Sequence, residues 1–279
     1  MNQLTYTPDL TNFAATAALA MGVEKSEHMS KPVTELVDAL TARAGGTIEK
    51  ALFFHVDAVP AYVVEKNKEI FVPVRNKVQY EIPFRAVMPS ITPVCFAAMF
   101  SGAYPAYNGV SKHCQPILNE MVVQPTISCD TIIEILVRAG KKVAVVTCAD
   151  GCIASMLYNR GADLYIIPGD DDKAMYAKAH SILRESQYDA IFLYQLSYDY
   201  TMHKYGPESK EALEVLHNLT NRFEVLVETA QETWKEHRIM TVFNSDHGSH
   251  LREDGFGIHG DDIPEDMNMM WFFGAYAPK

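Results

Sequence analysis

From about residue 51 onward the chain alternates short apolar segments with longer amphipathic ones, and this alternation limits the fold more than any other feature. The apolar segments have the length and composition of buried strands, and the amphipathic segments have a helical period. Such alternation predicts an α/β fold with a mostly parallel central sheet and helices on both faces. The expected strands are 51–59, 142–148, 162–168, 189–196, 239–244 and 269–276, and the expected helices are 126–140, 150–161, 171–186 and 208–237.

The remainder of the chain gives no sign of a second unit. Residues 1–45 have the pattern of two helices, at 10–23 and 32–45, which we expect to pack on the outside of the sheet. Low-complexity linkers, internal repeats and charge blocks are absent from the sequence. With 48% hydrophobic residues, the chain can bury a substantial core. We therefore expect a single domain over residues 1–279, with 1–45 as a helical segment packed on it.

The charge and the cysteine content narrow the classes of partner and compartment. There are 24 Lys and Arg against 35 Asp and Glu, a net charge of −11, which argues against a nucleic-acid polymer or an anionic membrane as the main partner. No apolar stretch has the length of a membrane helix, and the first residues lack the features of a signal peptide. Five scattered cysteines fit reduced thiols. A cytoplasmic protein is the expectation, with its oligomeric state open.

Polar residues interrupt the apolar pattern just after three of the expected strands. They are Asp57, Asp199 and the adjacent pair Asp246 and His247. In open α/β sheets, ligands bind in the crevice beyond the carboxyl ends of the strands, so these side chains can converge there. Taken singly, each aspartate is more often a turn former or a helix cap.

Two further histidines complete a set of possible metal ligands. His203 follows Asp199 by four residues, and His259 lies in the segment GIHGDD. Asp and His are ligands for zinc and manganese. Six such groups can form two three-ligand sites, each with a position open for substrate, as a catalytic metal pair requires. The alternative is six independent polar residues.

A threonine at the start of an apolar helical segment is the candidate nucleophile. Thr92 precedes Pro93 in PSITPVCFAAMFSGAYP, residues 89–105. Thr is a favoured N-cap, Pro is favoured at the first helical position, and Gly102 stands where a C-terminal cap belongs. A threonine hydroxyl is a poor nucleophile until a base or a metal lowers its pKa. The segment alone is therefore compatible with a cap or with a nucleophile.

Together the motifs resemble the alkaline phosphatase superfamily, and within it the type I phosphodiesterase/nucleotide pyrophosphatase and phosphonoacetate hydrolase branch. Thr92 is followed nine residues later by SGAYP and then by Gly109, as in that branch. DYTMHKYGPES, NSDHG and GIHGDD are similar to the metal-binding motifs of the family and occur in the same order. The resemblance runs from about residue 50 to the end of the chain and is weak between roughly 115 and 185.

The resemblance implies a fold, a metal pair and an activity. The family fold is a mostly parallel sheet between layers of helices. Two divalent ions are implied, zinc being favoured and manganese the alternative, and one of them also holds the Thr92 oxygen. Each ion is implied to have three protein ligands, namely Asp57, Asp246 and His247 for one, and Asp199, His203 and His259 for the other. The implied activity is hydrolysis of small phosphodiesters or nucleotide pyrophosphates through a covalent phosphothreonine, with free N–H groups at the start of the Thr92 helix facing the phosphate.

One departure from the family leaves the substrate open. Twenty-one residues after the nucleophile the branch places an asparagine, whereas this chain has His113, preceded by Lys112. Either residue can donate a hydrogen bond to phosphate, and we expect them either to contact substrate or to lie in a surface loop. Phosphomonoesterase and phosphonate hydrolase activities are alternatives, as is a non-catalytic relic that binds metal. A sulfatase is disfavoured because the Cys or Ser and the Arg of that branch are missing, and the short segment before Asp199 leaves little room for the inserted domain of a phosphosugar mutase.

Three residues close to the expected ligands have less definite roles. His55 precedes Asp57 by two residues and so lies on the same face of its strand, where we expect a hydrogen-bonded core histidine. His250 and Asp261 are expected to be hydrogen-bond partners of the ligands.

Overall fold

Five adjacent strands run parallel through the centre of the computed structural model, and four of them are fully buried. The structure describes residues 6–112, 115–117, 121–123, 126–149 and 152–279. The parallel strands are β1 (Lys50–Val56), β5 (Val143–Cys148), β6 (Asp163–Ile167), β7 (Ala190–Gln195) and β8 (Ile239–Asn244). Every residue of β1, β5, β7 and β8 is buried, because helices cover both faces, and this explains their continuous apolar sequences.

Two antiparallel strands complete one edge of the sheet. β11 (Asn268–Tyr276) pairs with β8, and β2 (Tyr80–Arg85) pairs with β11. The strand order is therefore β2-β11-β8-β1-β7-β5-β6. The predicted α/β fold with a mostly parallel sheet is confirmed. β2 was not predicted: its residues alternate between exposed and buried, and it contains Pro83, which an edge strand tolerates.

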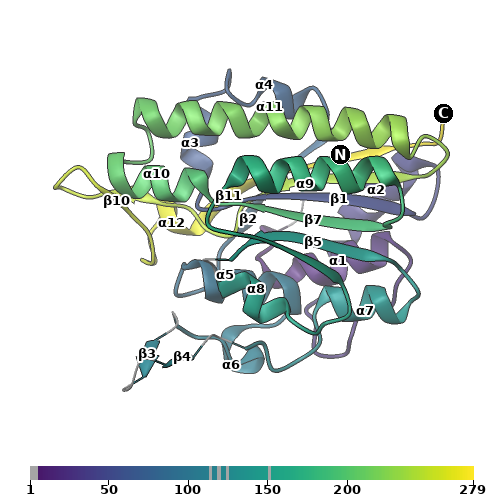
Figure 1. The fold of residues 1–279 in the computed structure, drawn as a ribbon, viewed down its shortest axis with the longest axis horizontal. Helices are drawn as coiled ribbons and strands as arrows, with labels where there is room; N and C mark the ends of the chain where they lie inside the picture. Colours follow the sequence, from purple (N-terminus) through teal and green to yellow (C-terminus); the bar gives the residue numbers. More distant parts are fainter. Residues whose placement is uncertain (1–5, 113–114, 118–120, 124–125, 150–151) are drawn as a thin grey trace.

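Helices lie on both faces of the sheet (Figure 1). On one face are α9 (Asp172–Glu185) and α11 (Lys210–Thr233), and on the other are α1 (Thr11–Ala20), α5 (Thr92–Ser101) and α8 (Cys152–Leu157). α2 (Thr34–Ala44) packs against β11 and α1. Phe13 of α1 reaches the sheet, where its ring lies 5.5 Å from that of Phe53 and 5.3 Å from that of Trp271, centroid to centroid.

The shorter elements connect this framework. α7 (Ile132–Arg138) is shorter than the helix expected at 126–140, because Thr131 and Glu134 form a capping box that fixes its start. The remaining helices are α3 (Ala61–Lys66), α4 (Val72–Arg75), α6 (Pro105–Asn108), α10 (Ser197–Tyr205) and α12 (Pro264–Met267). Two small hairpins pair β3 (Gln115–Ile117) with β4 (Met121–Val123) and β9 (His250–Leu251) with β10 (Gly257–Ile258). Among the described residues, no helix combines the length and apolarity needed to cross a membrane.

Candidate active site and metal centre

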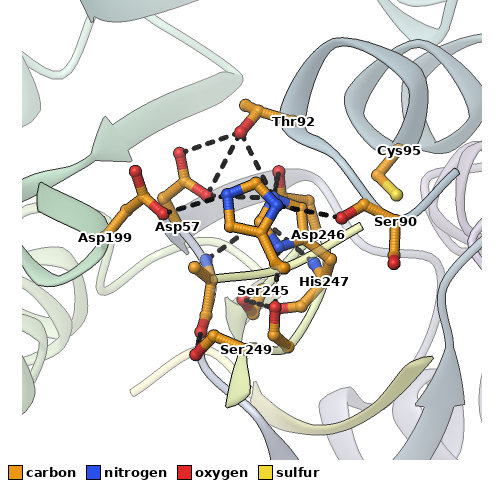
Figure 2. A network of polar contacts seen from close by, with 12 residues as sticks. Asp57, Ser90, Thr92, Cys95, Asp199, Ser245, Asp246, His247 and Ser249 are labelled. Atoms are coloured by element: carbon orange, nitrogen blue, oxygen red, sulfur yellow. Dashed lines mark hydrogen bonds and ion pairs between the residues drawn. The ribbon is translucent and has the colours of Figure 1, made fainter. Parts of the chain in front are cut away.

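Three neighbouring strands bring aspartates to the end of the sheet at which the parallel strands have their carboxyl ends. Asp57 directly follows β1, Asp199 lies in the first turn of α10 after β7, and Asp246 lies two residues after β8. Because β8, β1 and β7 are adjacent and parallel, their carboxyl ends meet there. The three aspartates are buried, and Figure 2 shows Asp57 between the other two and below Thr92.

A first cluster joins Asp57, Asp246 and His247 to Thr92. The Nε2 atom of His247 is 3.4 Å from Oδ1 of Asp57 and 3.5 Å from Oδ2 of Asp246. The Thr92 hydroxyl oxygen lies 3.2 Å from the same Nε2 atom, and 3.3 and 3.4 Å from the two oxygens of Asp57 (Figure 2). The hydroxyl therefore faces two of the three candidate ligands of this cluster, Asp57 and His247.

A second cluster adjoins the first. Oδ1 of Asp199 is 3.3 Å from Nε2 of His203 and 3.4 Å from Nε2 of His259. The rings of His247 and His259 are 4.1 Å apart, centroid to centroid, so the two clusters share a border. The structure thus brings together the six residues that the sequence motifs single out as metal ligands.

All three imidazoles are oriented by backbone carbonyl groups. Nδ1 of His203 lies 3.0 Å from the carbonyl oxygen of Gly257, and Nδ1 of His259 lies 3.1 Å from that of Ser90. Nδ1 of His247 lies 2.9 Å from the carbonyl oxygen of Gly248. The expectation that His250 and Asp261 would be these partners is wrong: His250 instead lies 2.7 Å from Asp266. A neutral ring that donates from Nδ1 carries a lone pair on Nε2, which here faces the carboxylates.

This arrangement of electron pairs fits divalent metal ions. Oδ1 of Asp199 and Oδ2 of Asp246 are buried and accept no hydrogen bond from the described part of the chain. Each faces an Nε2 atom, and two groups with lone pairs at such a distance are stabilised by a proton on the imidazole or by a metal ion between them. Nitrogen and carboxylate donors suit zinc or manganese. The two clusters therefore have the donor set of two three-ligand metal sites.

The electrostatics of the clusters follow from burial and from the neighbouring charges. Burial, and then the charges of Asp246 and Asp199, raise the pKa of Asp57 well above its ordinary value. Burial lowers the pKa of His247 to about 4, so its ring is neutral near pH 7. Burial would raise the pKa of Asp199, but His203 and His259 outweigh it and hold that pKa below its ordinary value.

Thr92 is the first helical residue of α5, so the prediction that it is the N-cap is wrong by one position. The N-cap is Ile91, which has an extended backbone and no capping side chain. The N–H groups of Val94 and Cys95 both donate to the Ile91 carbonyl, and Pro93 has no N–H. Among the described residues, only the Thr92 N–H at this end of the helix has no partner. Several free N–H groups are expected here from the sequence, and one group alone meets that expectation. Gly102 ends the helix as predicted, with a φ of 64°.

The structure describes one of the two candidate substrate contacts. Lys112 is exposed on the loop after α6. His113 lies outside the described residues. A contact of either residue with substrate stays a prediction.

Two residues behind the first cluster were missed or misread in the sequence. The Tyr194 hydroxyl donates to Oδ2 of Asp57, and burial, followed by the Asp57 charge, raises the pKa of Tyr194 well above its ordinary value. Nε2 of His55 lies 3.6 Å from Oδ1 of Asp246. The expectation of a hydrogen-bonded His55 is wrong, because neither ring nitrogen has a hydrogen-bond partner among the described residues. Tyr194 could have been found only from the register of β1 on β7, which pairs it with His55.

Comparison with solved structures shows the same fold at low sequence identity. Phosphonoacetate hydrolase from Sinorhizobium meliloti in complex with phosphonoacetate matches with a TM-score of 0.57 and 17% identity, over 74% of this chain and 58% of that one. Murine ectonucleotide pyrophosphatase/phosphodiesterase 5 in complex with AMP matches with a TM-score of 0.64 and 12% identity, over 82% and 88% of the two chains. The chain thus spans about three fifths of the length of the phosphonoacetate hydrolase.

The sequence itself assigns the family. No curated protein matches the chain. The family model for type I phosphodiesterase / nucleotide pyrophosphatase matches residues 52–271, a range that contains all six candidate ligands and Thr92. The chain therefore belongs to the type I phosphodiesterase / nucleotide pyrophosphatase family.

Proposed function

We propose that the protein is a two-metal hydrolase of small phosphodiesters or nucleotide pyrophosphates, with Thr92 as nucleophile. One observation carries the proposal: the Thr92 hydroxyl lies within 3.2–3.4 Å of His247 and Asp57, in the first of two adjoining clusters that each have a metal donor set. A nucleophile needs a group that lowers its pKa, and this hydroxyl has such a setting. Family membership supports the class of reaction.

The residues of the site have separable roles in this mechanism. Asp57, Asp246 and His247 would hold one divalent ion, and a second set, consisting of Asp199, His203 and His259, would hold the other. Bound divalent ions supply Lewis-acid stabilisation of phosphoryl charge and lower the pKa of a nearby hydroxyl. Thr92 then loses its proton and attacks phosphorus, and the bond to the leaving oxygen breaks. Water hydrolyses the resulting phosphothreonine and restores the hydroxyl.

Replacement of Thr92 tests the covalent mechanism. Thr92→Ala removes the hydroxyl but none of the six Asp and His candidate ligands, so we expect zinc content close to wild type and a kcat at least about 10³-fold lower. The measurements are metal content by mass spectrometry and rates on an aryl phosphate diester with zinc or manganese. Thr34→Ala is the matched control, because Thr34 is also the first residue of a helix without a capping side chain. A Thr92→Ala variant with near wild-type kcat would contradict the proposal.

Phosphomonoesters and phosphonates are the second class of candidate substrate. The structural likeness to a phosphonoacetate hydrolase, together with His113, preceded by Lys112, in place of the family asparagine, favours testing them. Rates on an aryl monoester and on phosphonoacetate should be compared with the diester rate. A faster diester reaction supports the first choice. A protein that binds metal but acts on none of the three would be the non-catalytic relic.

A further inference from the structure

We infer that Tyr194 and His55 are positioning residues of the first metal centre. Tyr194 hydrogen-bonds one oxygen of Asp57, and His55 lies beside one oxygen of Asp246. The other oxygen of each carboxylate faces Nε2 of His247. Because these roles presuppose the proposed metal centre, the experiment below separates failure of the centre from failure of this inference.

The two oxygens of Asp57 lie at similar distances from the Thr92 hydroxyl, 3.4 Å for Oδ1 and 3.3 Å for Oδ2, but their other partners differ. Oδ2 accepts a hydrogen bond from the Tyr194 hydroxyl. Oδ1 faces Nε2 of His247 at 3.4 Å. The carboxylate is buried, and Tyr194 is the one described side chain behind it that donates a hydrogen bond. Tyr194 therefore selects the rotation of Asp57 that points Oδ1 at the candidate metal.

Asp246 shows the same division between its two oxygens. Oδ1 accepts hydrogen bonds from the backbone N–H groups of Ala58, at 3.3 Å, and His247, at 3.0 Å, and lies 3.6 Å from Nε2 of His55. Oδ2 accepts no hydrogen bond from the described residues and is 3.5 Å from Nε2 of His247. His55 packs beside this oxygen without a hydrogen bond, at an anchor that the backbone already provides, so its effect should be smaller than that of Tyr194.

The two positioning residues also hold each other in place. Their rings stack with centroids 5.4 Å apart and an angle of 17° between the planes. The Phe96 ring packs edge-on against both, at 6.0 Å from His55 and 6.4 Å from Tyr194. The one cavity described beside these rings has a volume of about 10 Å³ and is lined mainly by apolar side chains. The stack therefore links the Asp57 and Asp246 side chains mechanically.

Zinc titration of metal-stripped protein, with one centre disabled, measures each centre separately. Asp199→Asn leaves the first centre as the single complete site, and Asp246→Asn leaves the second. In the Asp199→Asn protein, we expect Tyr194→Phe to weaken zinc binding about 10- to 100-fold, as loss of such outer partners does in other metal sites. His55→Phe should weaken it less. In the Asp246→Asn protein, Tyr194→Phe should change the affinity less than twofold.

Tyr188→Phe is the matched control. Tyr188 is also a buried tyrosine and lies just before strand β7. Its hydroxyl donates a hydrogen bond of 2.6 Å to the carboxylate of Asp163. The substitution should lower thermal stability without changing either zinc affinity. Unchanged zinc affinity of the first centre in Tyr194→Phe would overturn the inference, as would equal weakening of both centres. Failure of both single-centre proteins to bind zinc would overturn the proposed metal centre itself, and the inference with it.

Discussion

At the residue scale, His247 makes the stability of the metal-free protein depend on pH. Its ring is fully buried, and burial lowers its pKa from 6.5 to about 4. The unfolded chain therefore binds a proton at this residue between pH 6.5 and pH 4, while the folded protein does not. His247 contributes its full stabilisation above about pH 6.5, and that contribution is lost as the pH falls toward 4.

A stability profile of the metal-free protein checks this prediction. Between pH 7 and pH 4 the wild type should lose about 3 kcal/mol more unfolding free energy than His247→Gln, which cannot titrate. Urea unfolding at several pH values in the presence of a chelator gives both curves. Asp57 has a raised pKa, so its contribution to the unfolding free energy changes with pH in the direction opposite to that of His247. This contribution is present in both proteins, so the difference between the two curves reports on His247. Parallel curves would show that His247 titrates normally in the folded state.

Single residues also show how far the sequence can predict the site. The six candidate ligands and Thr92 are visible because they stand in short motifs after apolar strands, and the structure places them in two adjoining clusters. The role of Tyr194 cannot be predicted from a motif, because this residue lies inside the apolar strand β7 and has the pattern of a core residue. Its contact with Asp57 depends on strand order and register, which no local pattern contains.

At the element scale, the start of α10 is fixed by a residue from another helix. Oδ1 of Asp172, in α9, accepts from the N–H of Leu196 at 2.9 Å, and Oδ2 accepts from the N–H and the hydroxyl of Ser197. Asp172 is buried, so its removal leaves these donors without a partner. Because α10 carries Asp199 and His203, a shift of its first turn moves two ligands of the second centre.

Asp172→Ala should therefore affect both stability and one metal site. We expect a loss of about 1–3 kcal/mol in unfolding free energy, and weaker zinc binding at the second centre than at the first. Urea unfolding and zinc titration measure the two effects. The neighbouring Asp171→Ala is the control: Asp171 caps α9 through the Ala174 N–H, so it should lose about 1 kcal/mol of stability and no zinc affinity. Equal zinc affinities in the two variants would rule out this role for Asp172.

The elements themselves were predictable to different degrees. The buried parallel strands were found because both of their faces are apolar, which gives a signal within each segment. β2 was missed because it pairs antiparallel at the edge, with only alternate residues buried. α10 was missed because its nine residues include Asp199, His203 and three tyrosines, and its apolar face is short. Elements with a mixed surface are fixed by tertiary contacts that the sequence does not display.

At the scale of the whole molecule, the candidate ligands join distant parts of the chain. They lie after β1, in α10, after β8 and beyond β10, so the two centres connect segments from residue 57 to residue 259. Without metal, three aspartates lie buried side by side, and their mutual repulsion opposes folding. The single-domain organisation over 1–279 stays a prediction, but metal binding would couple these segments whatever its boundaries.

Removal of metal should therefore destabilise the protein as a whole. At a free zinc concentration 1,000-fold above Kd, one site stabilises the folded state by about 4 kcal/mol. For a chain of this size about 1 kcal/mol corresponds to roughly 2–4 °C in Tm, so chelation should lower Tm by about 10 °C for one centre. Differential scanning calorimetry with and without a chelator measures the change. A variant that carries both Asp199→Asn and Asp246→Asn should show little response, since neither centre is complete. A wild-type Tm that is independent of metal would mean that the buried carboxylates are neutralised by protons alone.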